Sequence, residues 1–251
     1  MAKQKGIIKL EGTIGEITFH KSKDGYIAKE KSSLSAERIA TDPAFARTRE
    51  NGAEFGRAGK AGKVLRNSLR SALQRARDSR MVGRLTGDMM RVVKADSTNG
   101  RGLRTVIDGD ATLLRGFEFN GNAKLSTTLY APYTSSINRT TGEVTITLQP
   151  FVPASMVAAP TGTTHFRLLA ASSAVDFAGG VFTADLAESS LLPLDQAPTA
   201  ALSLTMSLPA ASTNPLFLAA GIEFFQEVNG TQYPLNNGSF NALSLVQVEV
   251  A

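Results

Sequence analysis

The sequence predicts an α+β protein, in which an N-terminal β-hairpin and a basic helical segment precede a mostly antiparallel β-sandwich. Two patterns predict this arrangement. Small and apolar residues recur every three or four positions from Phe55 to Val92, which is the period of an amphipathic helix. Beyond about residue 112, short runs of Thr, Ser, Val, Leu and Phe are separated by Gly, Pro and Asn, as in antiparallel strands. Because no helical pattern separates these runs, a sandwich is favoured over a parallel α/β sheet.

Charged residues are divided unevenly along the chain. Residues 1–115 contain 24 Lys and Arg against 13 Asp and Glu, and residues 116–251 contain 3 against 9, so the two parts carry net charges of +11 and −6. Such parts can attract each other between copies, and the basic part can also attract phosphate. With the periodicity, this predicts three segments: an arm over 1–34, a basic helical region over 35–111 and a β-sandwich domain over 112–251.

The N-terminal arm has the pattern of paired strands. Ile17 and Phe19 alternate with polar neighbours before a turn at Asp24-Gly25, which predicts a β-hairpin. The segment from Ile7 to Ile14, which is broken by Gly12 and followed by Gly15, should precede it as an edge strand or an arm. Since an edge strand can pair with another chain, Ile14, Ile17 and Phe19 are candidates for an assembly interface.

The remaining elements follow from local signals. Asp42-Pro43 supplies an N-cap and a proline at the first helical position, so a helix should begin there. Gly83 and Gly87 are the expected places for a break or kink, so the helical region is either a helical pair or one interrupted long helix. Hairpin turns are expected at Thr141-Gly142 and Asn229-Gly230. Six strands are expected, at 125–131, 143–148, 165–170, 201–208, 215–227 and 242–250.

Four glycines, Gly52, Gly56, Gly59 and Gly62, recur at helical spacing within the basic region. Each costs about 0.8–1 kcal/mol relative to alanine in a helix, so another interaction should offset the loss. A helix face lined with glycine lets a second backbone approach closely, either within the subunit or from a neighbour. Both alternatives stay open, and the four glycines complete the candidate assembly interface.

Basic side chains on the same helix are candidates for polyanion contact: Arg57, Lys60, Lys63, Arg66 and Arg70. No aromatic residue lies between Phe55 and Phe117, so this segment lacks a platform on which single-stranded bases could stack. The run GRAGKAGKV also fails as a nucleotide-binding loop, because the required upstream glycine and the following Ser or Thr are missing. Two interpretations of this face remain: a solvated or subunit-facing basic surface, and a surface that contacts duplex nucleic acid or another polyanion nonspecifically.

Catalytic signals are lacking in the sequence. The chain has no cysteine and only two histidines, and no nucleophile, metal cluster or cofactor motif can be assembled from its residues. The N-terminus MAKQKGIIKLEG has no apolar core of a signal peptide, so we expect synthesis in the cytoplasm, with the final location left open. No apolar run approaches the roughly 20 residues that span a bilayer. We therefore expect no enzyme, no cofactor and no membrane span.

Three stretches resemble a family of uncharacterised, cysteine-free bacterial proteins with no established activity. They are GTIGEITFHKSKDGYIAKEK, RTRENGAEFGRAGKAGKVLR and IEFFQEVNGTQYPLNNGSFNALSLVQVEVA. The resemblance extends over most of the chain and implies a bacterial protein. It implies no mechanism and no site residues.

The function expected from these observations is that of a noncatalytic structural protein that self-assembles into a homo-oligomer such as a filament, tube or shell. Contacts between unlike surfaces close into a ring or continue as a polymer, and the sequence leaves both open. The alternative is a polyanion or nucleic-acid binding module that uses the basic helix. Carbohydrate binding by the sandwich is disfavoured, because the chain has no Trp and only four Tyr for stacking.

Overall fold

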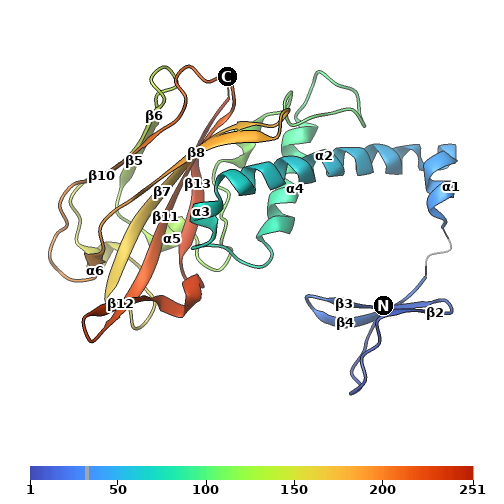
Figure 1. The fold of residues 1–251 in the computed structure, drawn as a ribbon, viewed down its shortest axis with the longest axis horizontal. Helices are drawn as coiled ribbons and strands as arrows, with labels where there is room; N and C mark the ends of the chain where they lie inside the picture. Colours follow the sequence, from blue (N-terminus) through green and yellow to red (C-terminus); the bar gives the residue numbers. More distant parts are fainter. Residues whose placement is uncertain (32–33, 251) are drawn as a thin grey trace. The chain divides into compact units, whose positions relative to one another are not determined.

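A computed structural model describes residues 1–31 and 34–250 of the chain (Figure 1). It confirms the α+β class, with helices and mostly antiparallel sheets. The chain divides into unit 1, Met1–Glu50, and unit 2, Asn51–Ala251. The three segments expected at 1–34, 35–111 and 112–251 stay a prediction, and the helical residues beyond 51 share a hydrophobic core with the sheet.

Unit 1 contains a four-stranded antiparallel sheet in the order β1-β4-β3-β2. Its strands are β1 (Ala2–Lys3), β2 (Gly12–Ile14), β3 (Ile17–Ser22) and β4 (Gly25–Glu30). The predicted hairpin at Asp24-Gly25 is confirmed, with Gly25 at a φ of 112°. Of the edge strand or arm expected over 7–14, only the end forms a strand, and this strand, β2, lies at an edge of the sheet. The Gln4 side chain accepts a hydrogen bond from the Leu10 amide (2.9 Å) and so keeps the preceding part of the segment in a loop.

The helical part of unit 1 begins after residue 34. Helix α1 (Ala36–Thr41) is capped by Ser35, whose hydroxyl accepts from the Arg38 amide. Asp42 then accepts from the Ala44 amide at 2.9 Å, and Pro43 opens the 3-10 turn η1 (Pro43–Phe45). The predicted cap is therefore confirmed, and helix α2 (Ala46–Ser68) follows it.

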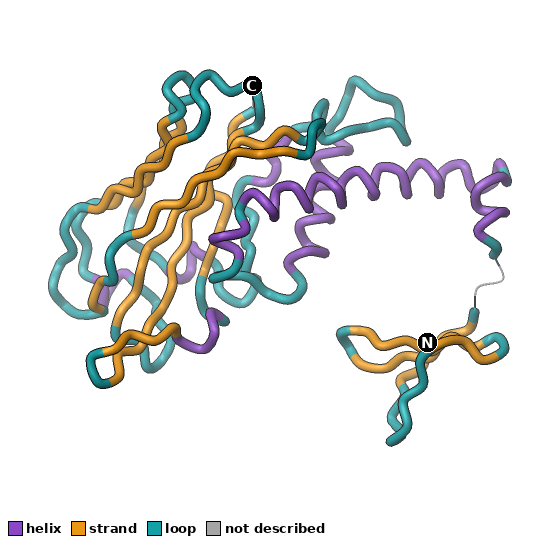
Figure 2. Tube along the Cα trace, viewed as in Figure 1, coloured by secondary structure: helices purple, strands orange, loops and turns teal. Residues whose placement is uncertain are grey.

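Unit 2 contains two antiparallel sheets and a layer of helices (Figure 2). The smaller sheet is formed by β5 (Tyr133–Ile137), β6 (Glu143–Leu148) and β10 (Leu202–Ser207). The larger sheet is formed by β7 (His165–Asp176), β8 (Val181–Glu188), β9 (Leu192–Pro193), β11 (Leu216–Val228), β12 (Thr231–Pro234) and β13 (Ala242–Glu249). Shorter helical elements are α3 (Arg70–Leu73), η2 (Ala111–Leu114), α5 (Leu125–Thr128), α6 (Pro153–Met156) and η3 (Leu235–Gly238).

Strands β7 and β11 lie at the centre of the larger sheet and are buried on both faces. On β7, Phe166 and Leu168 pack toward the smaller sheet, whereas Leu169 and Ala171 pack toward the helices. Side chains on β11 alternate between the same two cores. These strands therefore read as continuous apolar runs without the usual alternation of apolar and polar residues.

Helix α4 (Met81–Lys94) completes the helical layer and packs against α2. Leu65 of α2 shares the core with Leu85 and Met89 of α4, all of them buried. Of the break or kink expected at Gly83 and Gly87, the break is wrong, because both glycines lie inside the continuous helix α4. The helical region is instead interrupted between α2 and α4, where the side chains of Leu69 and Leu73 are buried in the core.

The strand predictions succeed where apolar and turn signals agree. Strands lie at five of the six expected places, and Asn229-Gly230 joins β11 to β12. The strand expected over 125–131 is wrong, because its first part forms the one-turn helix α5. Leu125 and Leu129 are both buried, and their spacing of four residues suits a helical turn as well as a strand face. Strands β5, β8, β9 and β12 were not predicted.

Four charged side chains join the helical layer to the larger sheet. Arg75, which follows α3, contacts Glu188 of β8 at 2.6 Å and Glu223 of β11 at 3.3 Å. Arg167 of β7 contacts the same two carboxylates at 2.8 and 2.7 Å. Hydrogen bonding to Glu188 raises the pKa of Arg75, and hydrogen bonding to Arg75 lowers the pKa of Glu188. Part of the charge complementarity between the two parts of the sequence is thus satisfied within one subunit.

Glu223 is the buried member of this network, so its removal tests the junction. Replacing Glu223 with Ala leaves Arg75 and Arg167 with one carboxylate between them, and we expect the free energy of unfolding to fall by about 3 kcal/mol. Urea unfolding followed by circular dichroism measures the loss. Glu227→Gln, at the exposed end of the same strand, is the control and should change stability by less than about 1 kcal/mol. Equal stability of Glu223→Ala and the wild type would contradict the assigned role.

Candidate functional site

The predicted interface residues of the arm share one face of the unit 1 sheet. Ile14 pairs directly with Ile17, and Phe19 pairs with Gly12 on one side and Ala28 on the other. Side chains alternate along each strand and paired residues point the same way, so Ile14, Ile17 and Phe19 lie on a common face. The structure brings these three candidates together.

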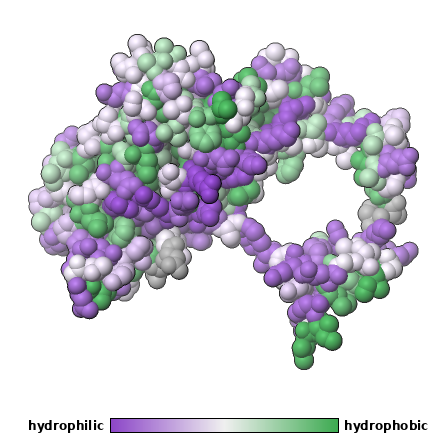
Figure 3. All heavy atoms as spheres, viewed as in Figure 1, coloured by the Kyte–Doolittle hydropathy of each residue, from purple (hydrophilic) through white to green (hydrophobic). Residues whose placement is uncertain are grey.

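The described residues of unit 1 form no hydrophobic core beneath this face. Among the described residues of unit 1, none is buried, and Ile14 and Ile17 are 63% and 47% exposed. Ile7 and Ile8, in the loop before β2, are also largely exposed. Apolar side chains are visible at the surface of unit 1 in Figure 3. Exposed apolar residues gathered in one small unit typically mark an interaction surface.

The tip of the β2–β3 hairpin, Ile14–Ile17, combines apolar and acidic side chains. Gly15 and Glu16 form its two-residue turn, in which Gly15 has a φ of 58° that suits glycine at the first turn position. Glu16 is exposed, and no described residue forms an ion pair with it. The tip therefore presents a carboxylate between two exposed isoleucines.

The four candidate glycines do not form one packing surface. A side chain at Gly62 would contact Leu85 and Met89 of α4 at 3.7–3.8 Å, so this glycine packs within the subunit. Apart from the adjoining residues and backbone of α2 itself, a methyl group added at Gly52, Gly56 or Gly59 would meet no described atom within 4 Å. Internal packing thus accounts for Gly62 alone, and the other three present open backbone on α2.

The five basic candidates also separate into different environments. Arg57 donates to the carbonyls of Gly102 (2.6 Å) and Arg104 (3.0 Å), so its guanidinium supports a loop and is not free. Arg66 is partly buried, and this burial lowers its pKa. Lys60, Lys63 and Arg70 are exposed without a charged partner among the described residues.

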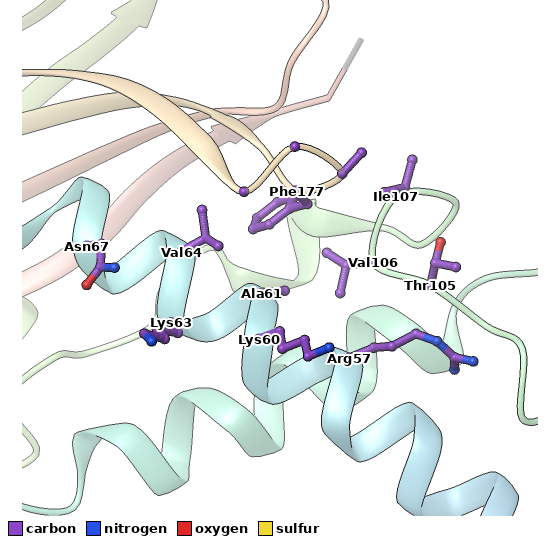
Figure 4. A pocket seen from close by; sticks show the side chains of 13 residues that line it. Arg57, Lys60, Ala61, Lys63, Val64, Asn67, Thr105, Val106, Ile107 and Phe177 are labelled. Carbon is purple, nitrogen blue, oxygen red and sulfur yellow. The ribbon is translucent and has the colours of Figure 1, made fainter.

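A cleft of about 600 Å³ lies beside helix α2, which we call the α2 cleft (Figure 4). Its walls are α2, the 105–107 loop and the turn between β7 and β8. Figure 4 shows Ala61, Val64 and Val106 between α2 and the ring of Phe177, with Lys60 and Lys63 on the α2 side. The lining residues are Arg57, Lys60, Ala61, Lys63, Val64, Asn67, Thr105, Val106, Ile107, Phe177, Ala178, Gly179 and Gly180. The cleft thus combines an apolar lining with a cationic rim.

The wall formed by the 105–107 loop is fixed from two sides. Glu54, buried on α2, accepts a hydrogen bond from the Gly102 amide at 2.7 Å, next to the carbonyl that Arg57 holds. Asp96, at the end of α4, accepts from the amides of Thr98, Asn99 and Thr105 at 2.8–2.9 Å. These contacts preorganise the cleft. Sequence spacing gave no signal for them, because the partners lie up to 48 residues apart.

No family model, curated protein or solved structure matches this chain. The resemblance to the bacterial family therefore stays a prediction. Within residues 1–31 and 34–250, no helix is long and apolar enough to cross a membrane. No group of three or more His, Cys, Asp or Glu in this part of the chain is placed to hold a metal ion.

The cleft wall should respond to pH through Asp96. Desolvation favours the protonated carboxyl, but hydrogen bonds from Asn99, Thr105 and Thr98 outweigh it and lower the pKa of Asp96 to about 2. An unfolded aspartate titrates near 3.9, so the stabilisation is present above about pH 4 and is lost as the pH falls toward 2.

Asp96→Asn should therefore be less stable than the wild type at pH 7, with a difference that narrows between pH 4 and pH 2. Urea unfolding at each pH measures the difference, and hydrogen exchange should show faster exchange in residues 98–107. Asp88→Asn, which removes only a surface ion pair with Arg91, is the matched control. A difference that stays constant from pH 7 to pH 2 would contradict the assignment.

Proposed function

We propose that this protein is a noncatalytic structural protein whose copies assemble through the unit 1 sheet. One observation carries the proposal: this sheet has an apolar face, yet none of the described residues of unit 1 is buried. An antiparallel sheet is stable when its apolar face packs on another layer. Covering that face is therefore the role we assign to a second copy.

The free energy available from this contact is substantial. Fully burying an exposed isoleucine contributes about 1.5–3 kcal/mol, and Ile14 and Ile17, which are 63% and 47% exposed, each have roughly half of this gain still available. Strands β1 and β2 also end the sheet without a further partner strand among the described residues, so their backbone groups can extend it. Apolar burial and strand addition both favour a protein partner over a small ligand.

The form of the assembly follows from the surfaces used. If the unit 1 sheet contacts unlike surfaces of the next copy, the contact is heterologous and gives a ring or an open polymer. A filament, tube or shell is consistent with such a contact. Because Arg75 already pairs with acidic residues of its own subunit, we assign the electrostatic contribution to the exposed lysines and arginines that remain.

Light scattering of the full chain at micromolar concentrations should give a mass above that of one chain. Ile17→Ser should weaken association roughly tenfold or more, because it removes one buried apolar side chain from the contact. Val228→Ser is the matched control, since Val228 is 46% exposed at the end of β11 and Ile17 is 47% exposed. Circular dichroism checks that both variants stay folded. A monomer at every concentration from 50 to 500 mM salt would overturn the proposal.

A second candidate function is polyanion binding, which a groove at the end of α2 favours. Arg66, Arg70 and Arg77 line this groove, and one Arg66 nitrogen is buried without a hydrogen-bond partner among the described residues. An unpaired buried donor is costly, and a phosphate or carboxylate oxygen would satisfy it. The arginines that line the groove supply the positive charge such a ligand requires.

Binding of fluorescent duplex DNA tests this candidate. We expect weak, sequence-independent binding at low salt only, as for most basic surfaces. Reversing the charge of Arg70 and Arg77 should reduce the salt slope by about 0.9 for each phosphate that is no longer neutralised, and Lys94→Glu on α4 is the control. A dissociation constant below about 10⁻⁷ M at physiological salt would favour nucleic-acid binding over the structural function.

A further inference from the structure

The hairpin tip of unit 1 and the α2 cleft of unit 2 are complementary in chemistry. The tip carries two exposed isoleucines on either side of Gly15-Glu16. The cleft has an apolar lining that includes Val106 and Phe177, with Lys60 and Lys63 at its rim. The apolar side chains of the tip therefore match the apolar lining of the cleft, and the Glu16 carboxylate of the tip is opposite in charge to the two lysines.

We propose that the α2 cleft of one copy receives the hairpin tip of a second copy. Ile14 and Ile17 contact the apolar lining, and the Glu16 carboxylate lies between Lys60 and Lys63. This inference rests on the proposed self-assembly and names the surface that the unit 1 sheet contacts. In this contact, unit 2 of one copy provides the binding site and unit 1 of another copy occupies it.

Local charge favours this occupant over other parts of unit 1. The unit as a whole is basic, with ten Lys and Arg against seven Asp and Glu. Residues 10–20 are the exception, because they contain two glutamates and neither Lys nor Arg. A cationic cleft attracts this segment and repels the lysine-rich segments on either side, so charge selects the β2–β3 hairpin.

The geometry on the two sides is compatible. Lys60 and Lys63 are three residues apart on one helix, so their Cβ atoms lie about 5–6 Å apart and one carboxylate can contact both. Ile14 and Ile17 are directly opposite in the hairpin, which places their Cβ atoms about 4.5–5.5 Å apart as one apolar pair. A cleft of about 600 Å³ is within the range of about 300–1,000 Å³ found for binding pockets.

The tip alone is smaller than a stable interface. Specific interfaces bury about 800 Å² on each partner, more than four residues at a hairpin tip supply. The rest of the apolar face, including Phe19 and Ala28, completes the contact once the tip is seated. The charge pair then determines the position of the contact, and the apolar face provides most of its affinity.

Charge reversal on each side tests the pairing in the full chain. Glu16→Lys alone and the double variant Lys60→Glu, Lys63→Glu should each weaken association at least tenfold by light scattering. Mixing the two variants should restore it, because the reversed charges match again between copies. Glu37→Lys on α1 and Lys94→Glu on α4 are matched controls that should assemble like the wild type.

Cross-linking gives a second readout that does not depend on association strength. Since the chain has no cysteine, Glu16→Cys and Lys63→Cys can be made as separate proteins and mixed with a short bis-maleimide, whose spacer bridges the longer Cα separation that a Glu–Lys ion pair leaves. A cross-linked heterodimer is expected from this mixture and not from Glu37→Cys mixed with Lys63→Cys.

The outcomes separate this inference from the proposed function. A wild-type chain that stays monomeric overturns both. Wild-type assembly that the Lys60 and Lys63 reversals leave unchanged overturns only the pairing of tip and cleft. Loss of association in both charge variants without recovery on mixing, or cross-linking no faster than in the Glu37 control, also overturns the pairing. Recovery on mixing, together with the selective heterodimer, supports it.

Discussion

Burial of both faces of β7 and β11 is the constraint on which the rest of unit 2 depends. One face packs on the smaller sheet and the other on the helices, so a charged side chain on these strands has little access to water. Glu223 nevertheless lies on β11, and a buried carboxylate requires opposite charge nearby. Arg167 provides it from the neighbouring strand and Arg75 from the segment after α3. The path of the chain between α2 and α4 must therefore bring Arg75 to the sheet.

Elements with a purely local cause were predictable from the sequence. The alternation around Phe19 and the Asp42-Pro43 cap depend on neighbouring residues, and both predictions are confirmed. Elements determined by tertiary packing were not. Strand β7 continues six residues past its predicted end, because burial on both faces removes the polar alternation that marks a strand. Segment 125–131 failed for a related reason, since the spacing of Leu125 and Leu129 fits a helical turn as well as a strand.

The candidate surfaces were likewise predictable only where their cause is local in the sequence. Alternation placed Ile14, Ile17 and Phe19 on one face, and the structure agrees. Helical spacing grouped Arg57 with Lys60, but the Arg57 guanidinium reaches carbonyls more than 40 residues away and is not free. No spacing rule could have brought Phe177 and Val106 together beside α2. Exposure and long-range hydrogen bonding thus decide which residues of a periodic set are available to a partner.

The absence of a buried residue among those described in unit 1 has a consequence for the concentration at which the proposed assembly would begin. If a sheet acquires a hydrophobic core only when two copies associate, part of the binding free energy is used to order that sheet. Association then requires a higher subunit concentration than the contact area alone implies. In the self-assembly proposed above, this cost would raise the concentration at which copies begin to associate, so newly made chains would stay apart while they are dilute.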